Sequence, residues 1–281
     1  MSLVINTNVA SLDAQRNLAN NSEAVQVSVQ RLSSGLRINS AKDDAAGLAI
    51  SDRLRSQIRS IAVAIRNSQD GTSLSQTAEG GLAQIGDILA RMRELATQSA
   101  NGTIADTDRT ALNNEFTQLK DEIDRISNVT EFNGTKLLDG TLSTTLQVGF
   151  RNTANDRIDI SLNSAANSVS LGILGGINDT IAGDGTGQAN AQNMLTTLDA
   201  AISSVSSMRG TLGAIQNRLT STISNLSISS ENLTAADSRV RDADFALETA
   251  TFTRNQILVQ SATAILAQAN QLPSQALQLL K

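Results

Sequence analysis

The stretch that decides the fold runs from residue 198 to residue 240 and reads LDAAISSVSSMRGTLGAIQNRLTSTISNLSISSENLTAADSRV. An aliphatic residue occupies every seventh position of this stretch, namely Leu198, Val205, Leu212, Leu219, Leu226, Leu233 and Val240. An unbroken seven-residue repeat is typical of a coiled-coil helix. Because an α-helix rises about 1.5 Å per residue, the repeat predicts one continuous helix roughly 63 Å long.

The amino-terminal half carries the same spacing in shorter pieces. The apolar rows there are Leu18, Val25 and Leu32; Leu54, Ile58, Ile61 and Ile65; Leu82, Ile85, Leu89 and Met92; and Leu112, Phe116, Leu119 and Ile123. Asn101-Gly102, between the last two rows, predicts the turn of a helical hairpin. A single helix cannot bury its own apolar stripe, so helices from both ends must pair with each other or with other copies. The residues that we expect in this packing are Leu212, Leu219, Leu226 and Leu233 against Ile58, Ile61, Ile65 and neighbours such as Leu89.

The period changes in the middle of the chain. Asn133-Gly134 predicts a turn. Apolar residues then alternate with others at Leu146, Val148 and Phe150, and again at Ile158, Ile160 and Leu162. This alternation predicts a β-hairpin with a loop near 152–156, and the unpatterned residues 172–190 predict an exposed loop. The predicted fold class is mainly α, with long antiparallel coiled-coil helices from both termini and a small β-hairpin region.

The composition argues against catalysis. The 281 residues include no His, Cys, Trp or Tyr, and the formal net charge is −5. Without His and Cys the chain lacks imidazole bases, thiol nucleophiles and the usual zinc ligands. The acids Asp43-Asp44 lack the partners of an acid–base site, and GDGTG at 183–187 lacks the spacing of a phosphate loop. We therefore expect no catalytic residue, cofactor or metal.

Charge and hydropathy exclude other classes of protein. The arginines are scattered, so no concentrated basic face predicts binding to nucleic acid. No apolar run approaches the roughly 18 residues that a spanning helix requires, so we expect no membrane insertion. The start MSLVINTN has no basic segment followed by an apolar one, and no cleaved signal peptide is expected.

Several blocks of sequence resemble bacterial flagellin. They are VINTN at 4–8, QRLSSGLRINSAKDDAAG at 30–47, RELATQSAN at 93–101, EFNGTKLL at 131–138 and LAQANQ at 266–271. They stand in the order of the family, and the resemblance covers about residues 1–140 and 194–281. It implies a structural subunit that polymerises into the flagellar filament used for motility, and not an enzyme.

The resemblance also implies a division into layers. In this family the terminal helices form an inner coiled-coil layer, here residues 1–44 with 241–281. A second layer of helices with a β-hairpin surrounds it, here the rod domain of residues 45–175 with 193–240. Residues 176–192 are then a short loop in place of the outer domains that larger members carry.

The partners and location implied by the resemblance are those of an exported polymer. They are a helical homopolymer, the flagellar cap, junction proteins and an export chaperone, outside the cell on the bacterial flagellum. Export would use the flagellar type III system without a cleaved signal peptide. Arg91, Leu95 and Glu115 match positions by which Toll-like receptor 5 of vertebrates recognises the family, although inter-helix packing would also explain Leu95.

Three alternatives stay open on sequence alone. A flagellar hook–filament junction protein shares the terminal helices but does not polymerise extensively, and the block at 30–47 favours flagellin over it. A generic coiled-coil scaffold explains the heptads but not the other blocks. An enzyme would need a site that the sequence does not show.

Overall fold

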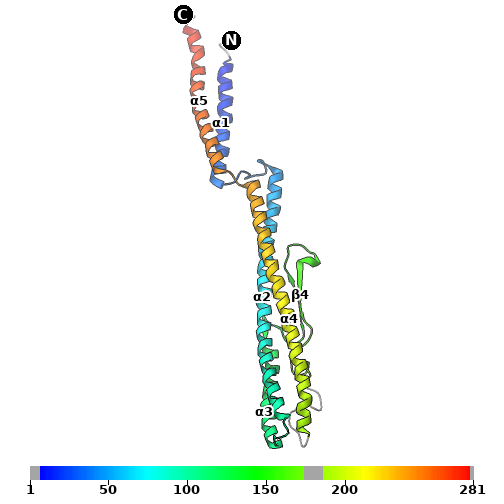
Figure 1. Cartoon of the computed structure of the whole chain (residues 1–281). Coiled ribbons are helices and arrows are strands. Elements are labelled where there is room, and N and C mark those ends of the chain that lie inside the picture. Colours follow the sequence, from blue (N-terminus) through cyan, green and yellow to red (C-terminus); the bar gives the residue numbers. More distant parts are fainter. Residues whose placement is uncertain (1–6, 174–185, 279–281) are drawn as a thin grey trace. The chain divides into compact units, whose positions relative to one another are not determined.

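The computed structural model describes residues 7–173 and 186–278, most of them helical. Its helices are α1 (Val9–Ser34), α2 (Ala45–Ser99), α3 (Asp106–Val129), α4 (Gly187–Arg241) and α5 (Phe245–Gln278) (Figure 1). Its strands are β1 (Glu131–Phe132), β2 (Thr135–Lys136), β3 (Leu142–Gln147) and β4 (Arg157–Leu162), with a 3-10 turn at Ala154–Asp156. The predicted mainly α fold is confirmed, and the seven-residue repeat lies within the single helix α4.

The chain forms two compact units. We call Met1–Ile58 with Glu231–Lys281 the terminal unit, and Arg59–Ser230 the central unit. These divisions fall inside α2 and α4, whereas the resemblance implies boundaries near residues 44 and 241. The cluster of large buried side chains lies wholly in the central unit, and the boundaries near residues 44 and 241 stay a prediction.

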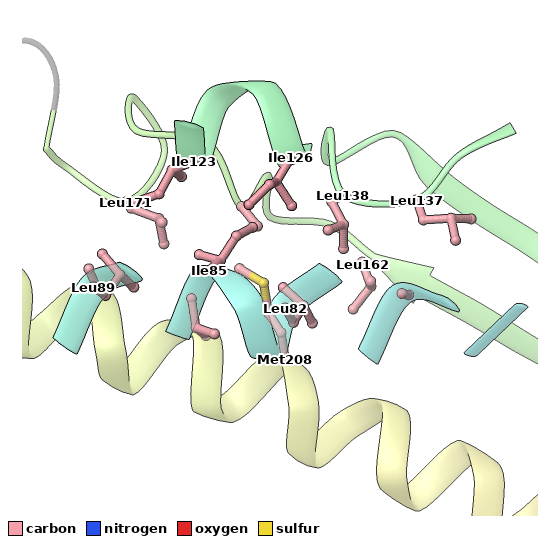
Figure 2. Close-up of a cluster of buried hydrophobic side chains, with 14 of the residues drawn as sticks. Leu82, Ile85, Leu89, Ile123, Ile126, Leu137, Leu138, Leu162, Leu171 and Met208 are labelled. Carbon is pink, nitrogen blue, oxygen red and sulfur yellow. The ribbon is translucent and has the colours of Figure 1, made fainter. Parts of the chain in front are cut away.

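The central unit is held together by one apolar core. Its members come from α2, α3, α4 and the segments that follow α3, as Figure 2 shows for Leu82, Ile85, Leu89, Ile123, Ile126, Leu137, Leu138, Leu162, Leu171 and Met208. Each of these side chains is at most 7% exposed. Positions 82, 85 and 89 lie three or four residues apart, so they share one face of α2. Helical spacing therefore places these side chains together.

Two glycines let the chain after α3 approach α2 closely. A Cβ atom added at Gly71 would lie 2.1 Å from Leu146 Cδ1, and one added at Gly81 would lie 2.8 Å from Leu138 Cδ1. Glycine inside a helix costs about 0.5–1 kcal/mol relative to alanine. The close packing of two leucines against the bare backbone of α2 explains why glycine is used at these positions.

Ion pairs fix the register of α2 against α4 in the central unit. Arg209 Nε lies 2.7 Å from Glu79 Oε1, and Arg93 Nε lies 2.6 Å from Asp199 Oδ1. The helices are therefore antiparallel. In this register Leu219 lies beside Gly71, where an added Cβ would be 3.4 Å from Leu219 Cδ1. Gly71 lies between two and three helical turns after Ile61, whereas we expected the row that contains Leu219 to pack against Ile61.

Burial along the packing row declines toward the end of α4. Leu212, Leu219, Leu89 and Ile61 are fully buried, whereas Ile65 and Leu226 in the central unit, and Ile58 and Leu233 in the terminal unit, are half-buried. The sequence repeat continues without a break across this change. The second half of the row therefore keeps apolar surface that the described residues 7–173 and 186–278 do not cover.

The predicted β-hairpin is present, but its strands are shifted. β3 pairs with β4 in antiparallel register, from Leu142 opposite Leu162 to Gln147 opposite Arg157. Val148 and Phe150, predicted as strand residues, lie beyond the ladder in a loop of residues 148–156. The ladder stops because the backbone N–H groups of Val148 and Gly149 both donate to the Asp156 carbonyl oxygen, at 2.9 and 3.1 Å. These two bonds close the loop in place of further strand pairing.

The predicted turn at Asn133-Gly134 is present, whereas part of the predicted loop at 176–192 is helical. At the predicted Asn133-Gly134 turn both residues are left-handed, with φ of 51° and 77°, and they join β1 to β2. Helix α4 begins at Gly187, so residues 187–192 are helical although we predicted a loop at 176–192. Ala191 is fully buried there, which favours the helix. Residues 174–185 of the predicted loop lie outside the described residues.

Truncating Leu219 tests the importance of the buried part of the row. We expect Leu219→Ala to lower the free energy of unfolding of the central unit by about 3 kcal/mol, because a cavity replaces a fully buried side chain. Urea unfolding followed by circular dichroism measures the change. The matched variant Leu226→Ala, seven residues along and half-buried, should cost about 1 kcal/mol. Equal costs at the two positions would contradict the observed decline in burial.

Candidate assembly surface

Helices α1 and α5 form an antiparallel pair in the terminal unit (Figure 1). At one end, Asn8 Nδ2 donates to the Ala269 carbonyl oxygen at 2.8 Å, and Ser11 Oγ donates to Asn270 Oδ1 at 2.7 Å. At the other end, Arg31 Nη1 lies 3.5 Å from Glu248 Oε2. The polar contacts at both ends fix the register of the pair.

The seam between these two helices combines small, buried side chains with large apolar side chains that are only half-buried. The half-buried ones are Leu18, Val25 and Leu32 of the predicted row, with Phe252, Val259 and Leu266. Among residues 9–34 and 245–271 the buried ones are Ser11, Ala14, Ser28, Ala262 and Ala269. Small residues let two helix backbones approach closely, but each buries little apolar area. Burial of apolar surface contributes about 25 cal/mol per Å². The seam therefore covers its large apolar side chains only in part.

Other large apolar side chains of the pair lie outside the seam and are exposed. Those of α1 and α5 that are at least 40% exposed are Val9, Leu12, Val29, Phe245, Leu247, Ile257, Leu258 and Ile265. Soluble monomers expose single apolar residues routinely, but a gathering of this kind marks an interaction surface. We call these eight residues the outward apolar set. Burial in α1 and α5 is inverted in one sense, because the fully buried residues are small, whereas the large apolar residues are half-buried or exposed.

A short connection joins α1 to α2 and is tied to the start of α5. Gly35, with φ of 71°, ends α1, and its carbonyl oxygen accepts from Ala243 N at 3.0 Å. Arg37 N donates to the Arg241 carbonyl oxygen at 2.7 Å. Ile38 is only 3% exposed. These bonds tie the end of α1 to the segment before α5 within the terminal unit.

Asp43 organises the same connection. Its Oδ2 atom accepts from Ser40 N at 2.9 Å, from Asn39 N at 3.1 Å and from Ser40 Oγ at 3.1 Å. These bonds, chiefly the one from the Ser40 N–H, hold the pKa of Asp43 below its usual value. The carboxylate therefore acts as a structural acceptor. The sequence prediction of no acid–base site stays a prediction.

The three positions matched to receptor recognition do not lie together on the surface. Arg91 Nη2 lies 2.8 Å from Glu115 Oε1, and Arg91 Nη1 lies 2.9 Å from Glu94 Oε2. The hydrogen bonds that Arg91 donates, chiefly to Glu94 and then to Glu115, raise the pKa of Arg91. Leu95, by contrast, is 1% exposed and belongs to the core. Arg91 and Glu115 therefore form an exposed pair, whereas Leu95 has the packing role.

The sequence analysis missed the outward apolar set. No heptad row was predicted after residue 240, although Phe252, Val259 and Leu266 repeat every seven residues and are half-buried, and further apolar residues from 245 to 269 occur on other faces of the helix. That distribution was itself a signal, since a helix apolar on most faces must be covered on most faces. Its cover could not be identified from spacing alone.

No group of metal-binding side chains occurs among residues 7–173 and 186–278. None of the helices in those ranges is long and apolar enough to cross a membrane. The inverted burial of α1 and α5 is thus the feature of the described chain that most clearly indicates a function.

Comparison with known proteins gives a consistent result over the whole chain. The family model of the bacterial flagellin N-terminal helical region matches residues 5–143, and that of the bacterial flagellin C-terminal helical region matches residues 195–280. The chain is 49% identical to a flagellin of Halalkalibacterium halodurans over 281 residues, covering 99% of this chain and 100% of that one. It is 46% identical to a flagellin of Bacillus subtilis, covering 99% of each.

A solved structure shares the fold. The structure of a putative flagellar hook-associated protein from Vibrio parahaemolyticus superposes with a TM-score of 0.60 and 17% identity. It covers 71% of this chain and 100% of that chain. At this identity the similarity concerns the fold alone.

Acidification tests the ion pair between Arg93 and Asp199. The hydrogen bond from Arg93 lowers the pKa of Asp199 from its usual 3.8. The stability that this contributes is complete above 3.8 and is lost as the pH falls through the lower pKa of the folded chain. We expect Asp199→Asn to lower the stability of the central unit at about pH 6, and the difference to vanish near about pH 2.

Urea unfolding at both pH values measures the effect. Asp121→Asn, which alters an exposed aspartate on α3, is the control for the loss of one charge. A deficit of Asp199→Asn that is the same at both pH values would show that the carboxylate charge is not responsible.

Proposed function

The chain belongs to the bacterial flagellin family, and on that basis we propose that it is the structural subunit that polymerises into the flagellar filament used for motility. The single observation that supports this function from the structure is the inverted burial of the terminal unit. The outward apolar set has no cover within the described chain, and further copies of the same chain would provide it. The outward apolar set is then covered only in the polymer.

A filament requires contacts that do not close. Two different faces of the subunit must meet, because such head-to-tail contacts repeat without limit, whereas a self-complementary face gives a dimer. The outward apolar set extends over both helices, from Val9 to Val29 on α1 and from Phe245 to Ile265 on α5. Faces on both helices are therefore available to neighbouring copies.

The layers implied by the family fit this surface. We propose that residues 1–44 and 241–281 form the inner core of the filament. Residues 45–175 and 193–240 surround it as the rod, and 176–192 stand in place of outer domains. The partly covered seam of α1 and α5 supports the inner position, because its stability would come from neighbours on several sides.

The junction protein is not favoured as an alternative. The chain is 49% identical to a flagellin over its whole length, and its similarity to the putative hook-associated protein is at 17% identity. The flagellin family is a family of structural proteins, and we propose no catalytic role.

The location of the protein, its export and its chaperone follow from the proposed role. We propose an extracellular position in the filament and export by the flagellar type III system without a cleaved signal peptide. An export chaperone would cover the outward apolar set before assembly, and the flagellar cap and junction proteins would meet the same subunit in the filament. The exposure of residues such as Ile257 and Ile265 supports a need for protection.

Recognition by Toll-like receptor 5 is a further proposal. The exposed ion pair of Arg91 and Glu115 would provide a charged contact, and Leu95 would support the local fold from below. This division of roles rests on the 50% exposure of the Arg91 side chain and the 1% exposure of Leu95.

Placing a charge in the outward apolar set tests polymerisation. We expect Ile265→Asp, at a residue that is 60% exposed, to abolish elongation from filament seeds, because a buried unpaired carboxylate is strongly unfavourable. Urea unfolding of the central unit should be unchanged. Light scattering and electron microscopy measure elongation.

The control places the same charge on the central unit. Val129→Asp alters a residue that is 55% exposed, and it should elongate as the unaltered chain does. Normal growth of filaments from Ile265→Asp would argue against the terminal unit as the assembly surface.

Alanine substitutions test the receptor proposal. Arg91→Ala and Glu115→Ala should each weaken activation of receptor-bearing reporter cells about tenfold, a loss typical of a charged interface anchor. Leu95→Ala should chiefly lower the free energy of unfolding, by about 3 kcal/mol. Arg125→Ala, which removes another exposed arginine paired to Glu122, is the control and should activate normally. Full activation by Arg91→Ala would contradict the assignment.

A further inference from the structure

The turn that joins α2 to α3 contains an asparagine followed by a glycine. Asn101-Gly102 was predicted as a turn, and it lies between Ser99, which ends α2, and Asp106, which begins α3. Both residues of the pair are exposed. The side-chain amide of an asparagine can react with the next backbone nitrogen, and a glycine there has no Cβ to hinder the ring closure. This turn is therefore a candidate site of covalent modification.

The conformation of the turn does not require glycine at position 102. Gly102 is not left-handed, whereas the described glycines that are left-handed are Gly35, Gly134, Gly140 and Gly172. A Cβ atom added at Gly102 would meet nothing closer than Gln188 Nε2, at 3.5 Å. A side chain would therefore fit, and alanine at this position should leave the fold intact.

The side chain of Asn101 is folded over the peptide group that follows it. Its Oδ1 atom accepts a hydrogen bond from the Thr103 N–H at 3.2 Å. This bond closes a local turn that contains the Asn101 side chain and the Gly102 backbone nitrogen. The side-chain carbon Cγ and that nitrogen are thereby kept close, and one new bond between them would close a succinimide ring.

The same hydrogen bond would assist the reaction. When a nitrogen attacks the side-chain carbonyl carbon, negative charge develops on Oδ1 of Asn101. A backbone N–H that is already aimed at this oxygen stabilises the developing charge, as the donors of an oxyanion hole do. The Thr103 N–H is therefore placed to lower the barrier to ring closure.

The attacking and leaving nitrogens are not held by hydrogen bonds. In the part of the chain that the structure describes, neither the Gly102 N–H nor Asn101 Nδ2 makes one. The backbone oxygen of Asn101, in contrast, accepts from Ile104 N at 3.2 Å and from Arg109 Nη2 at 2.8 Å. Because the pair is exposed, hydroxide can reach the Gly102 N–H while these bonds keep the turn closed.

We propose that Asn101 is a site of spontaneous deamidation in the folded chain. Hydroxide takes the proton of the Gly102 nitrogen, which attacks Cγ of Asn101. The new carbon–nitrogen bond forms as the bond from Cγ to Nδ2 breaks, and Nδ2 takes up a proton from water and leaves as ammonia. Water then opens the succinimide at either carbonyl carbon, which gives aspartate or isoaspartate. Water is consumed, ammonia is released, and no atom is oxidised or reduced.

The chain contains a second asparagine–glycine pair in a different setting. Asn133 and Gly134 are also exposed, but both are left-handed and form the tight turn from β1 to β2. The ladder pairs Phe132 with Thr135 on either side of this turn. Ring closure would have to rotate the Asn133 backbone out of this conformation and disturb the pairing. No strand pairing depends on the turn at Asn101, so folding should protect Asn133 and leave Asn101 reactive.

The two products affect the turn differently. Aspartate keeps the backbone intact and adds one negative charge. Isoaspartate carries the chain through Cγ, which displaces the backbone carbonyl group that Arg109 Nη2 now contacts. Arg109 is 5% exposed, and its Nε atom also donates to the Ser99 carbonyl oxygen at 2.9 Å. Formation of isoaspartate therefore loosens the contacts of a buried guanidinium with the end of α2.

Comparison of the folded chain with the urea-unfolded chain tests the site. The full, unassembled chain is incubated in mildly alkaline buffer with and without urea, and mass spectrometry of its peptides follows deamidation at each asparagine. In urea Asn101 and Asn133 should react at similar rates, because both are followed by glycine and neither is structured. In the folded chain Asn133 should react at least about tenfold more slowly than in urea, whereas Asn101 should react at least as fast as in urea.

Gly102→Ala is the matched variant. It should keep the urea midpoint of the unaltered chain and slow deamidation of Asn101 about tenfold, because a Cβ hinders attack by the following nitrogen. Isoaspartyl methyltransferase with a labelled methyl donor should mark the peptide that contains residue 101 in the aged unaltered chain. The same peptide of aged Gly102→Ala should stay almost unmarked.

The reaction needs only water, so this site does not depend on the proposed function. Folding that slows Asn101 as much as it slows Asn133 would overturn the assignment. An unchanged rate at Asn101 in a fully stable Gly102→Ala variant would overturn it as well. If Gly102→Ala is destabilised, the comparison of Asn101 with Asn133 in the unaltered chain decides alone.

Discussion

An amphipathic helix is stable only when something covers its apolar face, and this constraint governs both units of the chain. In the central unit, α3 and the hairpin cover α2 and α4, and residues such as Leu89 and Leu212 are removed from water completely. In the terminal unit α1 and α5 face each other, and their seam fully buries only alanine and serine, while its larger apolar residues stay half-buried. The apolar helix faces are covered within the chain in the central unit, whereas those of the terminal unit stay partly uncovered.

The difference between the units follows from side-chain size. Where α2 carries Leu82 and Ile85, the neighbouring segments form a core of large side chains. Where α1 and α5 carry Ala14 and Ala262 at their seam, larger residues such as Leu247 and Ile265 are placed outside. Glycine adjusts this pattern locally, since Gly71 and Gly81 let leucines from distant segments pack onto the backbone of α2. Side-chain size, including the lack of a side chain at glycine, thus decides which apolar surfaces are covered within the chain and which stay exposed.

Much of this could be predicted from the sequence, and the failures have physical causes. The repeat from Leu198 to Val240 predicted α4, because helical periodicity is a local property. The alternation that included Val148 and Phe150 was misleading, because strand pairing ends where Asp156 takes the backbone N–H groups. Leu95 packs in the core and is not a surface residue, and this outcome depends on contacts between segments that are distant in the sequence. Spacing along one helix says that a face is apolar, but it does not say what will cover it.

The partly covered seam between α1 and α5 has a thermodynamic consequence. A unit whose apolar surface is covered only by other copies has no fixed stability of its own, since mass action links its folding to the amount of protein present. Cooling weakens the same apolar contacts, so the link also depends on temperature. For this part of the chain, folding and association are a single equilibrium, and a substitution there changes the behaviour of a population of chains more than that of any one chain.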